Sequence, residues 1–264
     1  NDIKKTLNKK NSVEVTYNIK NTDRAIGTRL SHYIYKDFKN NKGEINPIKV
    51  NLNGSAGQSL GAFGIKNLKI CVTGDANDYV GKGLSGATII IKPPKESNLV
   101  SYENTIIGNT VLYGATSGKL FASGQSGERF AVRNSGAEAV IEGCDSNGCE
   151  YMTGGCVVIL GKVGDNFAAG MTGGIAFIYD PNQEFENYVN SNSVIWNIPE
   201  TDYWKGYLKN LISEHLRETQ SEIASKIINN YETEISFFRQ VCPKEMLGKL
   251  KNPISFKKNL LKAI

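Results

Sequence analysis

Two aspartates form the most enzyme-like feature of the sequence. Asp75 and Asp78 lie three residues apart in a segment bounded by glycines. Clustered carboxylates supply the acid and the base in enzymes that cleave polysaccharides. Here the pair flanks Asn77, and Asp and Asn side chains in turns usually accept hydrogen bonds from nearby backbone amides. We therefore expect a turn, with Asp75 and Asp78 available to contact another domain, and no catalytic residue.

Three of the five cysteines are close enough in sequence to suggest a metal or iron–sulfur site. They are Cys144, Cys149 and Cys156, and no fourth cysteine or histidine lies near them. Structural zinc sites use four such ligands. Cys156 also falls inside an apolar run. Free, buried thiols are therefore the better interpretation for these three and for Cys71 and Cys242, with no metal and no bound cofactor.

Two further segments could bind an anion. Residues 81–86 (GKGLSG) have the glycine content of a phosphate-binding loop, but no helix follows to supply N-terminal amides. Arg129 and Arg133 could clamp a carboxylate or phosphate. We expect instead that the loop is a repeat turn. We also expect the arginines to pair with one of three acids, Glu128, Glu142 or Glu150.

The sequence has two histidines, His32 and His215, which are far apart and have no motif serine or cysteine beside them. This arrangement does not favour a nucleophile–base pair. We expect each histidine to lie at the surface or in a terminal helix that caps the structure.

One small pattern returns through residues 67–180 and must position most of these groups. Each copy has a glycine, usually after a hydroxyl or amide residue, followed by a short Val/Ile-rich run. The spacings between marker glycines are 32, 18, 19 and 19, and these glycines are Gly86, Gly118, Gly136, Gly155 and Gly174. The longer spacing indicates one repeat plus an insertion near Pro93 and Pro94.

A period of about 19 residues with one short strand per repeat is typical of a solenoid. Each copy is too small to bury its own apolar face, so neighbouring copies must stack. The pattern predicts a mainly β fold, a parallel β-helix over residues 13–200, with the glycines at the repeat turns. The alternative is a glycine-rich β-sandwich with coincidental spacing.

The regions outside the repeat differ in composition. The net charge of +5 comes mostly from the first 49 residues, which hold 11 Lys/Arg and 5 acids. No aromatic residues interleave with Lys4, Lys5, Lys9 and Lys10 at the start of the sequence, so we expect residues 1–12 to be a disordered basic lead and not a nucleic-acid arm. No apolar run is long enough for a membrane span. This and the free thiols predict an intracellular protein, most simply cytoplasmic, with an organelle as the alternative.

Two helical regions flank the repeat. Residues 21–39 predict a helix capped by Thr22 or Asp23. After residue 200 the glycines nearly disappear, and apolar residues recur at spacings of three and four. Thr201 is placed to cap a first helix, and Thr219 or Ser221 a second. We expect residues 201–264 to be a helical extension that packs on the β-helix and covers an otherwise open end.

Several long motifs resemble the C-terminal domain of the glutamate synthase large subunit. Residues 74–86 (GDANDYVGKGLSG) are similar to the signature of that family. Further similar segments follow in the same order, at residues 21–25, 54–59, 108–118, 127–136, 148–155 and 166–171. The resemblance covers about residues 13–250. The Lys/Asn-rich lead and the insertion of residues 95–104 depart from the family pattern.

The resemblance implies a fold and a role. The family domain is a right-handed parallel β-helix to which no catalytic role is assigned. The parent enzyme makes two glutamates from glutamine, 2-oxoglutarate and a reductant. The expected partners are its glutaminase domain and its FMN-binding synthase domain, which also holds a 3Fe-4S cluster; FAD and NAD(P)H act through a partner subunit or domain. Cys144, Cys149 and Cys156 do not match the cluster cysteines.

Two other classes of function remain open at this point. One is a free-standing β-helix subunit similar to the one in formylmethanofuran dehydrogenase, which carries similar glycine repeats. The other is a carbohydrate-active enzyme, which needs a cleft lined by carboxylates and aromatic residues.

Overall fold

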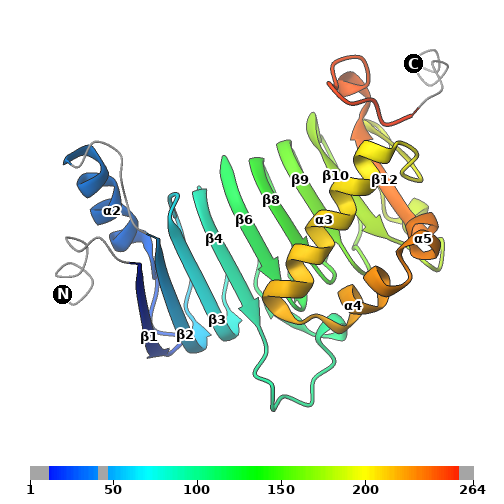
Figure 1. The fold of residues 1–264 in the computed structure, drawn as a ribbon. Helices are drawn as coiled ribbons and strands as arrows, with labels where there is room; N and C mark the ends of the chain where they lie inside the picture. The colour runs from blue at the N-terminus through cyan, green and yellow to red at the C-terminus, as the bar shows by residue number, and fades with distance from the viewer. Residues whose placement is uncertain (1–11, 41–46, 256–264) are drawn as a thin grey trace.

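The protein is mainly β, with one large, mostly parallel sheet and a group of helices near its C-terminal end (Figure 1). The computed structural model describes residues 12–40 and 47–255. Within them, twelve strands join in one sheet. The predicted mainly β class with C-terminal helices is confirmed. Residues 1–11 of the predicted basic lead lie outside the described residues.

Eight strands follow one another across the sheet in chain order, and each pairs in parallel with the next. They are β1 (Val13–Ile19), β2 (Ile48–Ala56), β3 (Leu68–Ala76), β4 (Ser85–Lys92), β6 (Ser117–Ala122), β8 (Ser135–Ile141), β9 (Thr153–Ile159) and β10 (Gly173–Tyr179). Two short strands off this path, β5 (Thr105–Ile107) and β7 (Gln125–Ser126), pair with each other, and β5 also pairs with β3.

The sheet ends differently from the prediction at its C-terminal side. Two antiparallel strands follow β10: β12 (Phe238–Pro243) pairs with β10, and β11 (Val194–Asn197) pairs with β12. The segment that contains β12 was expected to be helical. Its own sequence is short, and pairing with β10 on one side and with β11 on the other makes it a strand.

Alternation of side chains builds the first hydrophobic core. In β2, Ile48, Val50 and Leu52 are buried, and the residues between them point to the other face. The parallel register sets each of these beside an apolar residue of β3, for example Ile48 beside Leu68. Because apolar side chains of neighbouring strands lie side by side on the same face, each strand extends one continuous apolar layer.

The turns between strands have an unusual and regular backbone. Each contains three alternating residues with positive φ, and six successive turns share this pattern: Ser59, Gly61, Phe63; Tyr79, Gly81, Gly83; Thr110, Leu112, Gly114; Arg129, Ala131, Arg133; Asn147, Cys149, Tyr151; Asn166, Ala168, Gly170. Most of these residues are not glycine, so strain of this kind must be offset by the surroundings. Residues 81–84 belong to one of these turns and Ser85 and Gly86 begin β4, in agreement with the repeat turn expected at residues 81–86.

Hydrogen bonds between turns offset that strain. In the turn around Ala131, the amide of Ala131 donates to Val111 of the preceding turn, while Arg129 and Arg133 donate to Ser146 and Glu150 of the following turn. The middle residue of each triplet faces the core, since Leu112, Ala131, Cys149 and Ala168 are all fully buried. The turns therefore form a hydrogen-bonded stack of their own.

The marker glycines stand where neighbouring backbones meet. Gly86, Gly118, Gly155 and Gly174 all have positive φ. Gly136 lies outside that region, but a Cβ there would lie 2.1 Å from the carbonyl oxygen of Thr116. At Gly155, φ is +83° and a Cβ would lie 2.3 Å from the carbonyl oxygen of Ala137.

We expect Gly155→Val to destabilise the protein by about 1–2 kcal/mol or more, because it adds both a backbone clash and an unfavourable φ. The melting temperature should fall by several degrees, measured by circular dichroism. Gly206→Ala is the control, since its new Cβ meets nothing within 4 Å on a helix. An unchanged melting temperature for Gly155→Val contradicts the role assigned to this corner.

The helices and short 3-10 turns occupy the ends and one face of the sheet. The α-helices are α2 (Thr28–Asn40), α3 (Asp202–Thr219), α4 (Glu222–Asn229) and α5 (Tyr231–Glu234). The 3-10 turns are η1 (Ser101–Glu103), η2 (Phe185–Asn187), η3 (Ile235–Phe237) and η4 (Lys244–Met246). No helix in the described ranges is long and apolar enough to cross a bilayer.

The helix starts agree only in part with the prediction. The first helix begins at Thr28, not near Thr22, because Asp23 accepts a hydrogen bond from the amide of Lys20 in a tight turn. Ser221 caps α4 as predicted, accepting from the amide of Ala224. Thr201 stands at the start of α3, but its hydroxyl donates to the carbonyl of Pro253.

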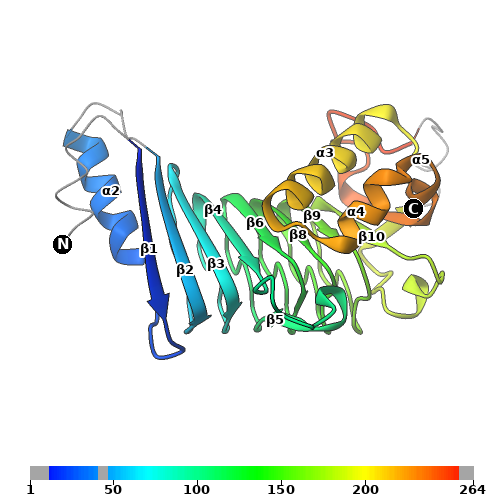
Figure 2. The same ribbon diagram turned by 60° about the horizontal axis from the view of Figure 1, so that its bottom comes forward.

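The C-terminal helices cover a face of the sheet and not its open end, which corrects the prediction. Helix α3 runs across β4, β6, β8 and β9 (Figures 1 and 2). A second hydrophobic core fills this layer, with residues from the sheet (Phe121, Val158, Phe177) and from the helices (Leu208, Ile212, Ile227).

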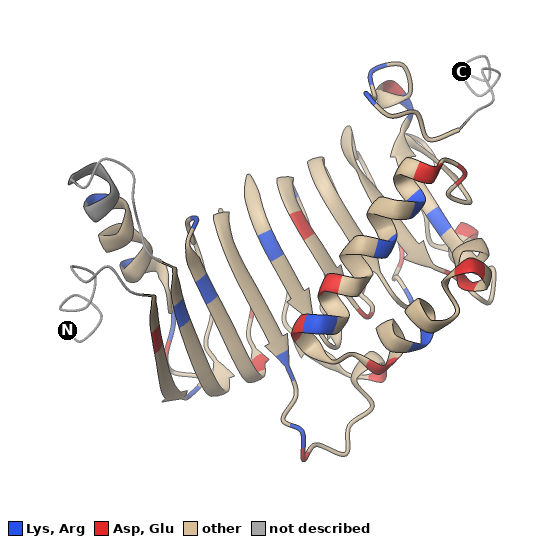
Figure 3. Ribbon diagram, in the orientation of Figure 1, with Lys and Arg blue, Asp and Glu red and all other residues tan. Residues whose placement is uncertain are grey.

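Ion pairs connect α3 to the sheet beside this second core, and Figure 3 shows the charged residues along α3 and the strands. Lys69 of β3 lies 2.7 Å from Glu218, and Lys119 of β6 lies 2.6 Å from Glu214, both acids being on α3. The chain therefore has two apolar layers that share one sheet.

Candidate functional site

The two predicted aspartates have different surroundings. Asp75 is exposed on β3 and lies beside Ser55 in the sheet register. Asp78 is half-buried, and its Oδ1 accepts a hydrogen bond from the amide of Asn109 at 2.8 Å. Asn77 Oδ1 in turn accepts from the amide of Asp78. Asp78 therefore holds two turns together, whereas Asp75 makes no ion pair or side-chain hydrogen bond with another described residue.

The cysteines are thiols in protein interior, with no ligand geometry. Cys144, Cys149, Cys156 and Cys242 are buried, and Cys71 is partly buried. Burial raises the pKa of Cys144 to about 12 and the pKa of Cys156 well above its ordinary value. Metal ligands and nucleophiles need the thiolate, which burial of this kind disfavours. Among the described residues, no group of three or more Cys, His, Asp or Glu could hold a metal ion.

The arginines do not converge on a common anion. Arg129 lies 2.9 Å from Glu150 of the following turn, so the predicted pairing between coils is confirmed for this residue. Arg133 lies over the ring of Tyr151 at 5.8 Å, a cation–π contact. Both side chains therefore support the stack of turns.

His215 lies in a C-terminal helix, one of the two predicted locations, and it is fully buried. It lies on α3 opposite Glu142, which directly follows β8, and both side chains have 0% exposure. His215 Nε2 is 3.5 Å from Glu142 Oε1. Ser123 and Ser221 donate hydrogen bonds to that oxygen, whereas neither ring nitrogen of His215 has hydrogen-bond geometry to a described residue. One buried carboxylate thus joins the sheet to both helices.

The sequence did contain a signal for this contact. His215 falls in the apolar stripe of its helix, three residues after Ile212 and four after Leu211, and Glu142 directly follows the buried run of β8. A charged residue at each of two core positions predicts a buried pair. Which acid would meet the histidine could not be read from the sequence, because the two residues lie far apart along the chain.

The network contains the residue types of a catalytic triad, but in an order that does not suit catalysis. The hydroxyl of Ser221 donates to Glu142 and not to His215, so no base is placed to activate it. Ser221 is only 1% exposed, and a substrate has no access to it. Burial acts to raise the pKa of Glu142, but the contact with His215, the charge of His215 and the hydrogen bond from Ser221 hold it below its ordinary value. The network is structural.

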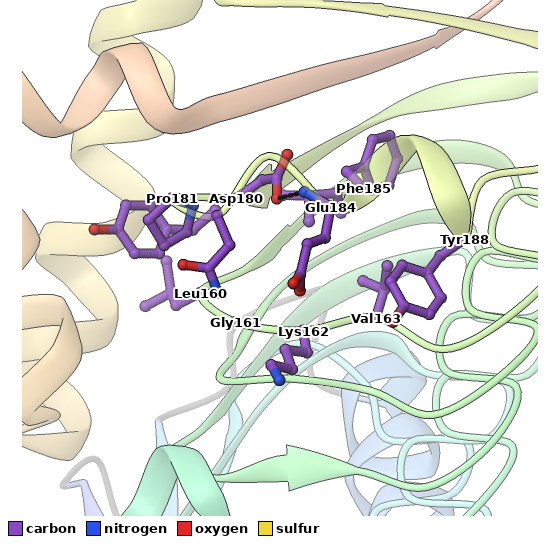
Figure 4. A pocket seen from close by; sticks show the side chains of 12 residues that line it. Leu160, Gly161, Lys162, Val163, Asp180, Pro181, Glu184, Phe185 and Tyr188 are labelled. Atoms are coloured by element: carbon purple, nitrogen blue, oxygen red, sulfur yellow. Dashed lines mark hydrogen bonds between the residues drawn. The ribbon is translucent and has the colours of Figure 1, made fainter.

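Cavities lined by described residues include two of different size and lining. The smaller, of about 160 Å³, lies beside η2, where Lys162 and Glu184 stand on facing walls (Figure 4). Asp180 closes one side by accepting from the amide of Glu184 and pairing with Arg239 at 3.3 Å. The cavity is smaller than ordinary cofactor pockets, which begin at about 300 Å³.

The larger cavity has a volume of about 580 Å³. It lies between the C-terminal ends of β2 and β3 and the insertion that leaves β4. Asp75 is part of its lining, together with serine, threonine and asparagine side chains.

Comparison with known proteins assigns the fold to a family. A family model described as the GXGXG motif matches residues 1–244. The chain belongs to the GXGXG motif family. The predicted family is thereby confirmed.

The relatives of this GXGXG chain are glutamate synthases. It is 54% identical over 246 residues to the glutamate synthase (NADPH) large chain of Azospirillum brasilense, covering 93% of this chain and 16% of the relative. It is 49% identical over 225 residues to the glutamate synthase (NADH) of Schizosaccharomyces pombe, 85% of this chain and 11% of the relative. It is 45% identical over 231 residues to the chloroplastic/mitochondrial ferredoxin-dependent glutamate synthase 1 of Arabidopsis thaliana, covering 88% of this chain and 14% of the relative. The chain therefore spans only a small part of the length of these relatives and corresponds to a domain of glutamate synthase.

Proposed function

We propose that this GXGXG chain is the non-catalytic, structural C-terminal domain of a glutamate synthase large subunit. The observation that carries the proposal is the 54% identity over 93% of the chain to a segment of a glutamate synthase large chain. The parent reaction is the conversion of glutamine, 2-oxoglutarate and a reductant to two glutamates. The same relatives favour this role over a free-standing subunit or a carbohydrate-active enzyme.

The proposed role is to hold the glutaminase and FMN-binding synthase domains of the same polypeptide in a fixed relation, so that ammonia passes between them. We propose that the sheet and the stacked turns close into a right-handed parallel β-helix over residues 13–200, on which residues 201–264 pack. Hydrogen bonds in both the sheet and the turns, such as Ala131 to Val111, support a stiff body. Stiffness suits this role because a misplacement of about 1 Å can reduce the rate of a positioned reaction about a hundredfold.

The cofactors of the proposed parent enzyme belong to its other parts. An iron–sulfur cluster needs cysteine thiolates around one point. Cys144 and Cys149 pack in the first core and Cys156 in the second, and burial raises the pKa of each. These residues do not fit the cluster. We therefore propose that FMN and the 3Fe-4S cluster bind to the other domains of the parent enzyme, and that FAD and NAD(P)H act through its partner subunit or domain. We also propose an intracellular location for the enzyme.

The purified chain of 264 residues should be colourless and should show no glutaminase or glutamate synthase activity. The reason is that no nucleophile or redox centre is assembled among the residues that the structure describes: four of the five thiols are buried, and the Glu142 network is structural. The measurement is an absorbance spectrum together with assays of both activities. A stoichiometric flavin or iron–sulfur spectrum, or glutamine hydrolysis by the chain alone, contradicts a purely structural role.

A further inference from the structure

The larger cavity is built by the insertion that departs from the family pattern. Its walls include Pro93, Pro94 and Leu99 from the segment between β4 and β5, and this segment projects from the sheet (Figures 1 and 2). Ser101 and Asn104 of the same segment complete the wall. The cavity volume of about 580 Å³ falls within the usual range for ligand sites.

The floor of the cavity is formed by the ends of β2 and β3. Gly54 and Gly74 lie beside each other in the register of these strands, with φ of +121° and +145°. A Cβ at Gly74 would lie 2.1 Å from the carbonyl oxygen of Gly54, so these glycines allow neighbouring strands to approach closely. Asn53, Ser55 and Thr73 flank the two glycines with hydroxyl and amide groups.

The charge of the lining selects the ligand. Asp75 is the one ionisable side chain in the lining, and it has no partner among the described residues. A lining without Lys, Arg or His offers nothing to balance a phosphate or carboxylate. It also lacks aromatic rings on which a sugar could stack. A carboxylate surrounded by hydroxyl and amide oxygens instead suits a guanidinium group, which presents five N–H donors and one positive charge.

The rim indicates that this group belongs to a peptide. The insertion exposes apolar side chains: Leu99, which is part of the lining, is 63% exposed, and Val100 and Tyr102 of the same insertion are each 38% exposed. A free amine inside the cavity leaves these side chains in water. A peptide can place a basic side chain in the cavity and cover the rim with its neighbours.

We propose that this cleft, bounded by the ends of β2 and β3 and by residues 93–104, receives an arginine side chain from a segment elsewhere in the same glutamate synthase polypeptide. The proposal rests on the proposed function, because the segment belongs to the rest of that enzyme. Asp75 forms the charged contact, the hydroxyl groups accept the remaining N–H donors, and the Leu99 rim packs against the segment backbone.

The test uses the full-length enzyme with a reporter thiol, Leu99→Cys. N-ethylmaleimide modification of that thiol is followed by mass spectrometry of the peptide that contains it, in native and in urea-unfolded protein after gel filtration. If a segment covers the rim, the native thiol reacts at least about tenfold more slowly than the unfolded one, and adding Asp75→Lys raises the native rate at least about fivefold by repelling the segment. Asp75→Asn, which keeps the size of the side chain, gives a smaller rise and replaces Asp75→Lys if that variant misfolds.

The matched control is Glu96→Lys, an equal charge reversal on the same insertion but outside the lining. It should change the rate less than about twofold. The proposal is overturned if the thiol reacts as fast in the native protein as in urea, or if Glu96→Lys and Asp75→Lys accelerate its modification equally. It is also overturned if the thiol is protected before gel filtration but not after it, because that result would indicate a small molecule that dissociates. If the thiol is protected but the full-length protein has no glutamate synthase activity, the proposed function is contradicted, whereas the proposal of a docked segment is supported.

Discussion

Replacing Glu142 by alanine should cost the folded protein about 3–5 kcal/mol, the usual effect of removing one member of a buried ion pair. The change leaves His215 at 0% exposure with no acid beside it and removes the acceptor of two serine hydroxyls. Because Ser221 also caps α4, the loss should be felt first in the helical layer. Urea unfolding measures the free energy, and hydrogen exchange of the amides of α3 and α4 locates it.

The control is the double variant Glu142→Met, His215→Met, which replaces both partners by apolar groups. Such a replacement of a buried pair is often close to neutral, so stability should recover by at least about half of the loss. If Glu142→Ala costs less than about 1 kcal/mol, the network does not join the helices to the sheet.

The same carboxylate predicts how stability depends on pH. The pKa of Glu142 in the folded protein lies below its ordinary value of 4.5, so the unfolded chain binds the proton more readily. Its contribution is therefore present above about pH 4.5 and lost as the pH falls through the lowered value. Melting temperatures measured from about pH 6 down to about pH 3 should decline less steeply for Glu142→Gln than for the native protein. If the melting temperatures of the native protein and of Glu142→Gln fall equally with pH, other carboxylates cause the loss of stability in acid.

Reversing the charge of Asp75 in the full-length glutamate synthase should uncouple its two half-reactions. Under the proposed function, glutamine-dependent synthesis needs the glutaminase and synthase sites in register, whereas ammonia-dependent synthesis does not. We expect Asp75→Lys to lower the glutamine-dependent rate about tenfold and to leave the ammonia-dependent rate within about twofold. The measurement is the ratio of the two rates in a variant whose circular dichroism spectrum is unchanged.

Asp78, which was also predicted to contact another domain, is left unchanged in this test. Its Oδ1 accepts from the amide of Asn109, so a lysine there would break a contact between turns. Glu96→Lys again serves as the control for charge alone. Loss of both activities in a folded Asp75→Lys protein would mean that this carboxylate takes part in chemistry or cofactor binding, and an unchanged ratio would place the interdomain contact elsewhere.

The sequence alone was enough for the features that repeat at short range. A glycine followed by an alternating apolar run defines each strand, and the regular spacing of the copies sets Lys69 beside Thr88 and Lys119 beside Glu138. Parallel pairing follows because each copy can bury its apolar face only against the next copy. The caps and apolar stripes of the C-terminal helices also depend on residues close together in sequence, and the predicted Ser221 cap is confirmed.

Only the tertiary structure decided which distant surfaces meet. The left-handed turn residues Arg129, Ala131 and Cys149 carry side chains that disfavour positive φ, and hydrogen bonds from neighbouring turns hold them there. The contact between Glu142 and His215 exists because α3 lies across the sheet. The strand β12 exists because β10 offers an edge, and the cleft at Asp75 exists because an insertion folds beside two glycines. Each of these depends on contacts between residues far apart in sequence, for which a local pattern carries no information.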